Sequence, residues 1–587
     1  MGKNRLAAAI LAVTILGLPL AGCSPEERPG PEESVASLAE GLSRLDVSGN
    51  EFAGSTVEAV NGMLAYEVSG MNLEPSVTVS KIEEISGSEA VATLKYVWDV
   101  NASPEDYSYE TTVTLERTRD SDWQTRFRST TVHPDLLPGQ RLVRKASSPP
   151  RADILGSGGS VLMRHWPVWR VGLDKSVLNP REYAESVFYL SLYLGLDTDA
   201  FAAKVQAAGP DAFVDAVTVR QDKVPPDFES DIATVPGAAA LPERQVLGPS
   251  PSFAAGLLGT VGPATADMAG AGPMAPGDLT GLSGLQQQYD SQLRGSDAVN
   301  VRIVGQDNAP SDPLFEAPAE PGTALQTTLD LPVQAQADAA VADSPGAALV
   351  AVQPSTGNVL AVANGPGTPG TQAALLGEYS LGTGFQPVTA LARLRAGIPA
   401  GSAETPGNAD ISAAAQALGL GVAAPLGTQA FYGSVPDGSD ETRQAASVSG
   451  PGEVVASPLA AAVAAASAAR GERVSPVLVL NPEDAGGTDQ DPPSGDSDTA
   501  RELTRAEAES LRSSMADGSS SGALDPLQSV SGGPVLAAAG TAGTGGEKAG
   551  HAWVTAVQGD LAVAVFVQGS GEDSAAVAAA FLQGLAG

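Results

Sequence analysis

The most specific pattern in this chain is Gly281-Leu-Ser-Gly-Leu-Gln-Gln-Gln-Tyr-Asp290, completed by Leu293-Arg294-Gly295. An amphipathic helix needs apolar residues three and four positions apart, but it has no need of glycine at Gly281, Gly284 and Gly295. About ten positions in a fixed order are hard to obtain by chance. The pattern therefore indicates one particular kind of domain rather than a generic helix.

The residues before this pattern belong to the same region. Leu257-Leu-Gly-Thr-Val-Gly262 is a second glycine-containing motif. Arg151-Ala-Asp-Ile-Leu-Gly-Ser-Gly-Gly159 is a third motif, which begins this region of the chain. Val171-Gly-Leu-Asp174 predicts the strand that follows it. The stretches 221–242 and 262–277 are rich in Pro, Gly and Ala. We expect both stretches to be loops or linkers.

After the pattern, the chain predicts alternating strands and helices. Thr327-Thr-Leu-Asp330 with Val333-Gln334 opens this region, and the apolar runs 347–354 and 359–361 predict two strands joined by a turn. Further elements are expected toward the end of the chain: an Ala-rich helix opened by 453–459 and ending at Ala469, strands at 551–553 and 561–567, and a closing helix over 574–585. The stretch 481–499 is acidic and rich in Gly, Pro and Ser, which predicts a surface loop.

The first third of the chain predicts a helix followed by strands. One helix face is shared by Val35, Leu38, Leu42 and Leu45. Apolar and polar residues alternate over 90–98, 109–115 and 123–127, which predicts three strands. His133 precedes Pro134 with no second His or Cys nearby, so we expect a structural role rather than metal binding.

The N-terminus carries an export pattern. Lys3 and Arg5 precede an apolar run from Leu6 to Leu20, which is too short for a comfortable membrane span and ends in Leu20-Ala-Gly-Cys23. This ending resembles a bacterial lipobox, in which the cysteine is lipidated and becomes the mature N-terminus. An ordinary signal peptide with a chance cysteine is the alternative. We expect a protein lipid-anchored at Cys23 to the outer face of the cytoplasmic membrane.

Composition excludes several functions. Cys23 is the only cysteine, so an intramolecular disulfide, a Cys-based metal site and a Cys nucleophile are excluded from the mature domain. The net charge of −35 and the absence of clustered Lys and Arg argue against a nucleic-acid partner. With 587 residues, the chain is long enough for several domains with sizeable cores.

The segment Tyr379-Ser-Leu-Gly-Thr-Gly-Phe-Gln386 continues into Pro387-Val-Thr-Ala390. It resembles the nucleophile loop Tyr-Pro-x-Gly-Ser-Thr-Phe-Lys-x-x-Thr-Ala of penicillin-binding transpeptidases. In this resemblance Thr383 takes the place of the nucleophilic Ser and Gln386 that of the Lys base. The chain has no lysine between Lys223 and Lys548, so no other Ser-x-x-Lys exists in this region.

Together these motifs resemble class B penicillin-binding proteins of the methicillin-resistance type. Trp123-Gln-Thr-Arg-Phe127, leading into His133-Pro134-Asp135-Leu136, resembles the end of the nuclear-transport-factor-like domain at the head of that family. The resemblance implies a multidomain α+β protein. It would combine a nuclear-transport-factor-like α+β domain, a pedestal (dimerisation-type) domain and a C-terminal serine β-lactamase/transpeptidase-like α/β sandwich.

The resemblance also implies domain boundaries. In chain order they are a lipoprotein signal peptide at 1–23, a tether at 24–33, the nuclear-transport-factor-like domain at 34–146, the pedestal domain at 147–320 and the transpeptidase-like domain at 321–587.

The other two catalytic motifs of the family are also altered. No acceptable Ser-x-Asn occurs between Leu391 and Ser457: Gly407-Asn408 lies too close to the first motif, and the helix that should carry the motif is shortened to 410–421. The Lys-Thr-Gly motif maps to Ala538-Ala539-Gly540, followed by Thr541-Ala542. Gly540 and Thr541 of the substrate groove are kept, while Ala538 replaces the lysine of the carboxylate clamp.

These replacements remove the chemistry that the resemblance implies. A hydroxyl nucleophile needs an adjacent base, and the Gln386 amide is not basic near neutrality. Loss of an activated nucleophile costs on the order of 10⁶ in rate, or roughly 8 kcal/mol. Backbone N–H groups near Thr383 could still form an oxyanion hole. We expect no turnover.

No other catalyst stands out in the sequence. His551 is the only histidine after residue 165, and we expect a structural role for it. The carboxylates of Asp437, Asp440 and Glu441 are expected in a solvated loop. Nothing resembles a phosphate loop, a zinc site or a dinucleotide fingerprint, so we expect no cofactor and no metal.

The sequence thus predicts a catalytically inactive pseudo-transpeptidase that acts as a scaffold or binding partner among the proteins of peptidoglycan synthesis. One alternative is an active D,D-transpeptidase acylated at Thr383. The other is a noncovalent sensor of muropeptides or β-lactams.

Overall fold

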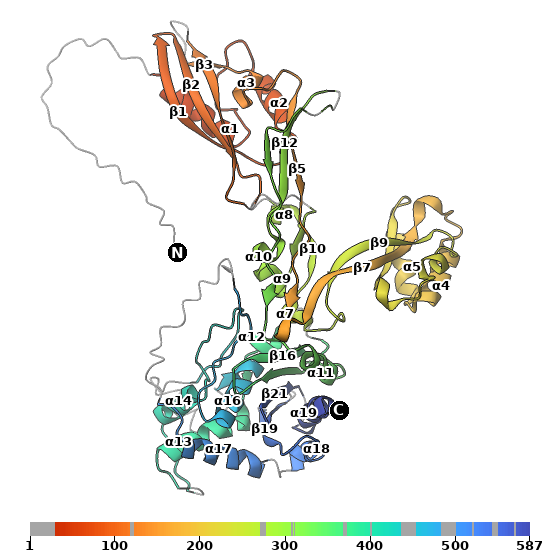
Figure 1. Ribbon diagram of the computed structural model, residues 1–587, viewed down its shortest axis with the longest axis vertical. Coiled ribbons are helices and arrows are strands. Elements are labelled where there is room, and N and C mark those ends of the chain that lie inside the picture. Colours follow the sequence, from red (N-terminus) through yellow and green to blue (C-terminus); the bar gives the residue numbers. More distant parts are fainter. Residues whose placement is uncertain are drawn as a thin grey trace, which may run out of the picture. The chain divides into compact units, whose positions relative to one another are not determined.

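The computed structural model describes residues 30–101, 103–117, 122–269, 277–306, 309, 311–367, 372–399, 402–435, 454–482, 501–518, 522–542, 550–568 and 571–586 (Figure 1). Cys23, the export pattern and the carboxylates at 437, 440 and 441 lie outside these residues, as does most of the acidic stretch 481–499. The chain divides into two compact units. The first holds 1–100, 106–144 and 301–315, and the second holds 101–105, 145–300 and 316–587.

The first unit is built on an antiparallel sheet with the strand order β1-β2-β3-β4. Its elements are α1 (Glu32–Ser43), α2 (Val57–Glu67), β1 (Ser76–Ser86), β2 (Glu89–Trp98), β3 (Tyr107–Glu116), β4 (Gln124–Arg126) and α3 (Ser129–Val132). The predicted helix and the three predicted strands are confirmed as α1, β2, β3 and β4. β1 was not predicted, because most of its side chains are solvated and its apolar alternation is weak.

His133 is a structural residue of this unit, as the sequence predicted. Its side chain is buried, and Nε2 lies 2.8 Å from the Tyr107 hydroxyl. Nδ1 accepts a hydrogen bond from the Asp135 N–H. Burial lowers the pKa of His133 to about 4, so the ring is neutral at physiological pH.

Three strands far apart in the sequence form a further sheet with the order β13-β12-β5. They are β5 (Arg141–Ser147), β12 (Ala298–Val304) and β13 (Phe315–Ala317). β12 is the central strand, so β5 pairs with a segment about 150 residues later in the chain.

Residues 150–330 combine long strands with short helices. β7 (Val161–Asp174) pairs with both β8 (Phe213–Arg220) and β9 (Ala238–Leu247). The other elements here are β6 (Ile154–Leu155), α4 (Tyr183–Leu194), α5 (Thr198–Ala207), α6 (Phe228–Ile232), α7 (Ala255–Leu258), β10 (Val261–Pro263), α8 (Ala266–Ala269), β11 (Leu279–Gly281), α9 (Gly284–Gln288), α10 (Asp290–Arg294) and β14 (Leu325–Gln326), with single 3₁₀ turns at 157–159, 175–177 and 221–223.

The prediction of loops at 221–242 was wrong in part. This stretch contains α6 and the start of β9, because Phe228, Ile232 and Ala240 belong to the small hydrophobic core beneath α4 and α5. In the other predicted linker, 262–277, α8 and part of β10 lie among the described residues, and 270–276 lie outside them. Composition alone could not show that these apolar residues close a core.

The glycines of the 281–295 pattern allow close backbone contacts. A Cβ at Gly281 would lie 1.9 Å from the Gln286 carbonyl oxygen. Gly284 and Gly295 have φ values of +58° and +69°, a conformation that favours glycine. At Gly295 a Cβ would lie 2.2 Å from the Glu320 carbonyl oxygen.

The C-terminal region contains a five-stranded antiparallel sheet with the order β16-β15-β21-β20-β19. These strands are β15 (Ala348–Val352), β16 (Val359–Asn364), β19 (Leu536–Ala542), β20 (His551–Gln558) and β21 (Leu561–Val567). The expected strands at 347–354, 359–361, 551–553 and 561–567 are therefore confirmed.

Helices cover both faces of this sheet (Figure 1). α11 (Leu331–Val341) and α19 (Gly571–Ala586) pack on one face with Leu349 and Ala351. α16 (Pro458–Arg470) packs on the other face with Ala348, Val350 and Val352. Successive strand residues point to opposite faces, so β15 is buried on both sides.

The remaining elements of this region surround the nucleophile loop. They are α12 (Ala373–Leu376), β17 (Tyr379–Ser380), the 3₁₀ turn η4 (Gly382–Phe385), α13 (Gln386–Arg395), α14 (Asn408–Ala417), β18 (Val455–Ala456), α17 (Arg505–Gly518), η6 (Gly522–Leu524) and α18 (Asp525–Gln528). The Ala-rich helix and the closing helix are confirmed as α16 and α19. The helix expected over 410–421 begins two residues earlier and ends at Ala417. Among the described residues, no helix combines the length and apolar character needed to cross a membrane.

Candidate active site

An aromatic cluster fixes the start of the nucleophile loop. The Tyr379 ring stacks on Phe566 with 3.8 Å between centroids. The Ser380 carbonyl oxygen accepts a hydrogen bond of 2.9 Å from the Trp553 indole and lies 2.8 Å from His551 Nε2. His551 therefore has the structural role expected from the sequence, and the loop is tied to β20 and β21.

Thr383 lies against the edge of β19. Its Oγ1 accepts a hydrogen bond of 2.9 Å from the Thr541 N–H. The hydroxyl also points at the Thr541 carbonyl oxygen, at 3.5 Å. The structure thus brings Thr383 together with Gly540 and Thr541, three positions named from the sequence, although 158 residues separate Thr383 from Thr541. Both of these contacts of the hydroxyl are with backbone atoms of Thr541.

The contact between η4 and β19 is a close approach of glycines. A Cβ built on Gly540 would lie 2.1 Å from the Gly384 nitrogen, and one on Gly382 would lie 2.1 Å from the Thr541 carbonyl oxygen. Gly382 has a φ of +51°. Because no side chain separates the two segments, the loop backbone lies directly on the strand edge. We call this contact the glycine seam: Gly382 and Gly384 against Gly540 and Thr541.

Gln386 and Ala538, the other two positions named from the sequence, lie close to the seam along the chain: Gln386 follows Gly384 in α13, and Ala538 precedes Gly540 in β19. Gln386 is exposed at the first residue of α13. Ala538 lies in β19 opposite Thr555 and is half-buried. An amide and a methyl group supply neither a base nor a cation, so these positions offer no proton acceptor for Thr383.

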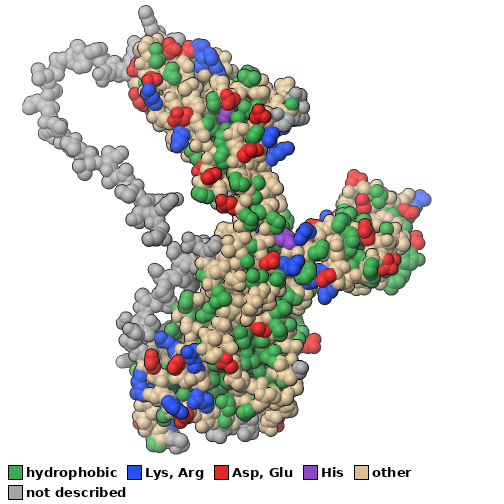
Figure 2. All heavy atoms as spheres, in the orientation of Figure 1, with side chains coloured by type: hydrophobic (Ala, Val, Ile, Leu, Met, Phe, Trp, Pro, Cys, Tyr) green, Lys and Arg blue, Asp and Glu red, His purple; other side chains and the backbone are tan. Residues whose placement is uncertain are grey.

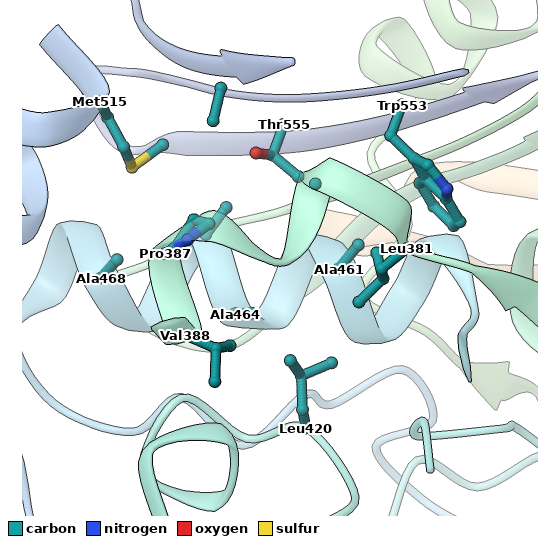
Figure 3. A pocket seen from close by; sticks show the side chains of 13 residues that line it. Leu381, Pro387, Val388, Leu420, Ala461, Ala464, Ala468, Met515, Trp553 and Thr555 are labelled. Atoms are coloured by element: carbon teal, nitrogen blue, oxygen red, sulfur yellow. The ribbon is translucent and has the colours of Figure 1, made fainter. Parts of the chain in front are cut away.

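A small apolar cavity of about 30 Å³ lies behind the loop (Figure 3). Its walls come from α13, α16, α17 and the β19–β20 pair. They are formed by Leu381, Gly384, Pro387, Val388, Leu420, Ala461, Ala464, Ala465, Ala468, Met515, Ala538, Trp553 and Thr555. None of these side chains is charged, so Ala538 faces an apolar space where the family resemblance places a lysine.

Arginines near the site are engaged in structural contacts. Arg393 donates hydrogen bonds to the carbonyl oxygens of Pro399, Ser402 and Glu404. Arg512 donates to the Ala469 carbonyl oxygen at 2.8 Å.

A buried ion pair joins α13 to α17. Arg395 Nε lies 3.1 Å from Glu507 Oε1, and both side chains are less than a tenth exposed. Burial by itself would raise the pKa of Glu507, but hydrogen bonds from the Thr504 N–H and Arg395 lower it. The pair holds α13, which follows the 379–385 segment, against α17.

Asn408 lies at the start of α14 and is buried. α14 packs against α13, the helix that follows the nucleophile loop. The sequence spacing had set this residue aside as too close to the first motif. Helix packing is the signal that places it in the same helical layer as α13, and spacing alone does not show this.

Among the residues that the structure describes, no group of three or more His, Cys, Asp or Glu side chains is arranged to hold a metal ion.

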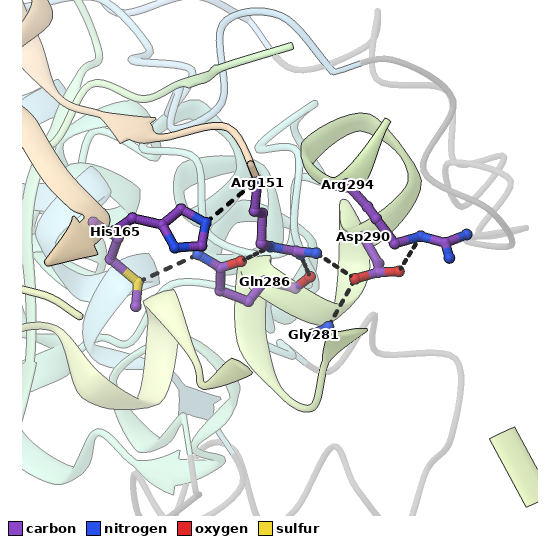
Figure 4. A network of polar contacts seen from close by, with 7 residues as sticks. Arg151, His165, Gly281, Gln286, Asp290 and Arg294 are labelled. Atoms are coloured by element: carbon purple, nitrogen blue, oxygen red, sulfur yellow. Dashed lines mark hydrogen bonds and ion pairs between the residues drawn. The ribbon is translucent and has the colours of Figure 1, made fainter. Parts of the chain in front are cut away.

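The 281–295 pattern forms a buried polar network with Arg151 (Figure 4). Arg151 donates hydrogen bonds of 2.7 Å from Nε to Gln286 Oε1, from Nη1 to Asp290 Oδ1 and from Nη2 to the Gln286 carbonyl oxygen. Asp290 Oδ1 also accepts the Gly281 N–H at 2.7 Å. Burial lowers the pKa of Arg151, and Asp290 opposes this effect. These hydrogen bonds connect the motif at 151–159 to the motif at 281–295, although more than 100 residues separate the two in the chain.

Comparisons with known proteins support this region most directly. Residues 146–327 match the family model of the penicillin-binding protein dimerisation domain. No curated protein matches the chain. Among solved structures, the chain is similar to the complex between penicillin-binding protein PBP2 and MreC from Helicobacter pylori, at 15% identity and a TM-score of 0.49, covering 75% of this chain and 98% of that one.

The mixed α/β, multidomain architecture expected from the sequence is therefore present, with a stretch at 146–327 like a penicillin-binding protein dimerisation domain.

Proposed function

We propose that this chain is a penicillin-binding-protein-like lipoprotein of cell-wall synthesis whose C-terminal domain is a catalytically inactive transpeptidase. The N-terminal sheet and helices would form a nuclear-transport-factor-like spacer, and residues 321–587 a transpeptidase-like domain. The protein would act as a scaffold or binding partner of the peptidoglycan-synthesis or elongation machinery.

One observation carries the proposal. The Thr383 hydroxyl is hydrogen-bonded to the backbone of Thr541, with Gln386 and Ala538 where a base and a cation would be required. A serine-type acylation needs a group that removes the hydroxyl proton as the oxygen attacks. Without it, the barrier rises by roughly 8 kcal/mol.

The glycine seam supports scaffolding over the sensor alternative. Backbone atoms of η4 and β19 already lie in direct contact where the family resemblance places the substrate groove. A muropeptide or β-lactam that added itself along this part of β19 would first have to separate the two segments. The preferred role is therefore one that does not use this groove.

The proposed location rests on the N-terminal pattern. Lipidation of Cys23 would tether the chain outside the cytoplasmic membrane, where peptidoglycan is assembled. Globomycin, which blocks lipoprotein signal peptidase, should leave the precursor uncleaved. Replacement of Cys23 by Ser should abolish incorporation of a labelled fatty acid into the chain. Unchanged labelling of this variant would contradict a lipid anchor at Cys23.

Intact-mass spectrometry tests the inactive site. Protein from Ser24 onward is incubated with excess benzylpenicillin, beside an active penicillin-binding protein as positive control. We expect an unchanged mass for this chain and an added ligand mass for the control. An adduct that maps to Thr383 and is lost in Thr383→Ala would establish the alternative, an enzyme acylated at this residue.

A further inference from the structure

Helix α4 carries large hydrophobic side chains on two opposite faces. Its inner face, with Val187 and Leu190, is buried in the small core of its domain. Its outer face exposes a row of large side chains: Phe188 (52% exposed), Tyr189 (48%), Leu192 (70%) and Tyr193 (45%). A helix on the surface of a soluble protein normally has one apolar stripe. The outer face of α4 therefore has more apolar area than the fold itself uses.

A groove of about 700 Å³ lies along this outer face. Glu185, Tyr189, Leu192 and Tyr193 of α4 form one side, and Asp231, Thr234, Val235 and Pro236 form the other. The Tyr193 hydroxyl donates a hydrogen bond of 3.0 Å to Asp231 Oδ2. The Tyr193 ring also lies 5.9 Å from Phe228. These contacts fix the position of Tyr193, so one wall of the groove is held in place.

The groove is apolar at its centre and acidic at its edge. Glu185 and Asp231 are among the eight lining residues, and none of the eight is basic. Figure 2 shows green hydrophobic and red acidic side chains next to each other on the domain that carries α4. A second copy of this chain would bring the same carboxylates against these, and an anionic phospholipid surface would be repelled in the same way.

We propose that this groove docks a peptide segment of another protein in which a large apolar side chain is flanked by Lys or Arg. The apolar side chain would pack against Leu192 and Tyr189, and the cations would pair with Glu185 and Asp231. Tyrosine-rich apolar centres with a charged rim are typical of protein interfaces. The surface adds a partner site to the scaffolding role proposed above, and it does not depend on the chemistry at Thr383.

Three fluorescein-labelled helical peptides test the proposal by fluorescence anisotropy on the protein from Ser24 onward. The first carries Leu on one face and Lys on the other, the second carries Glu in place of Lys, and the third carries Ser in place of Leu. We expect the Leu/Lys peptide to bind at least about tenfold more tightly than either of the others. Equal binding of the Ser/Lys peptide would mean attraction to the net charge alone and would overturn the proposal.

Matched variants locate the site. Leu192→Ser, and separately the pair Glu185→Gln with Asp231→Asn, should each weaken the Leu/Lys peptide by about tenfold. Ile85→Ser removes a side chain that is 61% exposed in the N-terminal unit and serves as the control. An unchanged affinity in Leu192→Ser would overturn the proposal. Leu192→Ser and Ile85→Ser should keep the wild-type melting temperature, because both side chains are exposed. Asp231 is half-buried and accepts the hydrogen bond of the Tyr193 hydroxyl. Glu185→Gln alone, at an exposed residue, is therefore measured beside the pair and separates loss of charge from displacement of Tyr193.

Two further measurements decide between occupants. A dimer in sedimentation velocity that dissociates in Leu192→Ser would assign the groove to a second copy, against the proposal. Leu192-dependent binding to phosphatidylglycerol vesicles would assign it to a membrane surface, also against it. Acylation of Thr383 in the mass assay would overturn the proposed function and leave these results unaffected.

Discussion

Glycine has a specific role at the centre of the candidate site. The backbone of η4 meets the edge of β19 at Gly540, where even one methyl group would overlap the Gly384 nitrogen. The reverse situation holds at Gly384, whose own Cβ would find its nearest neighbours at 3.7 Å, on Gly540 and Trp553. One contact thus offers two substitutions with opposite expectations.

We expect Gly540→Ala to destabilise the protein by about 1–3 kcal/mol, because overlap with backbone atoms forces the seam apart. Gly384→Ala is the matched control and should be close to neutral, because the added methyl group makes ordinary van der Waals contacts. Urea unfolding followed by tryptophan fluorescence measures both, since Trp553 lies beside the seam. Equal stability of the two variants would show that the segments are not in direct contact.

Asp338 on α11 makes stability depend on pH. Its carboxyl accepts hydrogen bonds from the Ala254 N–H and from Gln334, each 3.1 Å long. Burial raises the pKa of Asp338 to about 7, although these hydrogen bonds act in the opposite direction. The folded chain therefore holds this proton more tightly than the unfolded chain.

The stabilisation linked to this proton is complete below the unfolded pKa of about 3.8 and is lost as pH rises through about 7. Asp338→Asn cannot ionise, so its melting temperature relative to wild type should increase between about pH 4 and pH 8. The same change at the exposed Asp343 is the control. A constant difference between Asp338→Asn and wild type across this range would contradict a raised pKa.

Contacts between two helices hold the candidate site in place. α13 packs against α17. α13 also contacts η4, and α17 contacts β19, so both helices adjoin the glycine seam. The ion pair of Arg395 with Glu507 joins the two helices, and Glu507 Oε2 also accepts the Thr504 N–H at 2.7 Å at the start of α17. None of these contacts involves the side chains of Thr383, Gln386 or Ala538, so the packing of the two helices does not depend on the residue types at those positions.

Glu507→Ala should cost about 3 kcal/mol or more, because it leaves the Arg395 guanidinium buried without its partner. On the same helix, Glu509 pairs with Arg505 at the surface, with side chains 61% and 92% exposed. Glu509→Ala should therefore change stability by less than about 1 kcal/mol. Urea unfolding measures the two variants. Comparable losses would mean that burial of the Arg395–Glu507 pair is unimportant.

The pH dependence of this pair has the opposite sign to that of Asp338. The lowered pKa of Glu507 means that its stabilisation is present above the unfolded pKa of about 4.5 and is lost as pH falls below it. Wild type should therefore lose its advantage over Glu507→Ala in acid.

At the scale of the whole molecule, the two compact units are not continuous in sequence. Residues 301–315 belong to the first unit, where the Phe315 ring lies 5.4 Å from Tyr107. β12 supplies the strand between β13 and β5. The expected boundary at 146/147 separates the first domain from the second along the chain. The compact unit also includes residues 301–315, which come from a later part of the chain.

A fragment of residues 30–147 should consequently melt at a lower temperature than the same fragment joined by a Gly/Ser linker to residues 298–317. Without the second segment, β5 lacks its strand partner and Tyr107 loses Phe315. Circular dichroism melts of both fragments provide the measurement, and a scrambled 298–317 sequence is the control. If the intact and scrambled segments give the same melting temperature, the unit does not depend on 301–315.

Most elements could be predicted from local patterns. Alternating residues at 90–98 and 109–115 and apolar runs at 347–354 and 561–567 gave strands, because period-two patterning and continuous burial are local signals. The replaced positions Thr383, Gln386 and Ala538 could also be named from motif order alone. Their residue types were sufficient to predict that a base and a cation are missing.

Other features depended on contacts between distant residues. Phe228 and Ala240 lie in a stretch whose composition predicts a loop or linker, but in the structure both belong to one hydrophobic core. By sequence spacing, Asn408 lies too few residues after the first motif to be part of the second, and only the fold shows that its helix α14 packs on α13. Three contacts join residues more than 130 positions apart. The Thr541 N–H bonds to Thr383, Gly384 lies close to Gly540, and Arg151 makes three hydrogen bonds with Gln286 and Asp290. A local pattern carries residue type and period, but only the folded chain fixes which backbone atoms meet.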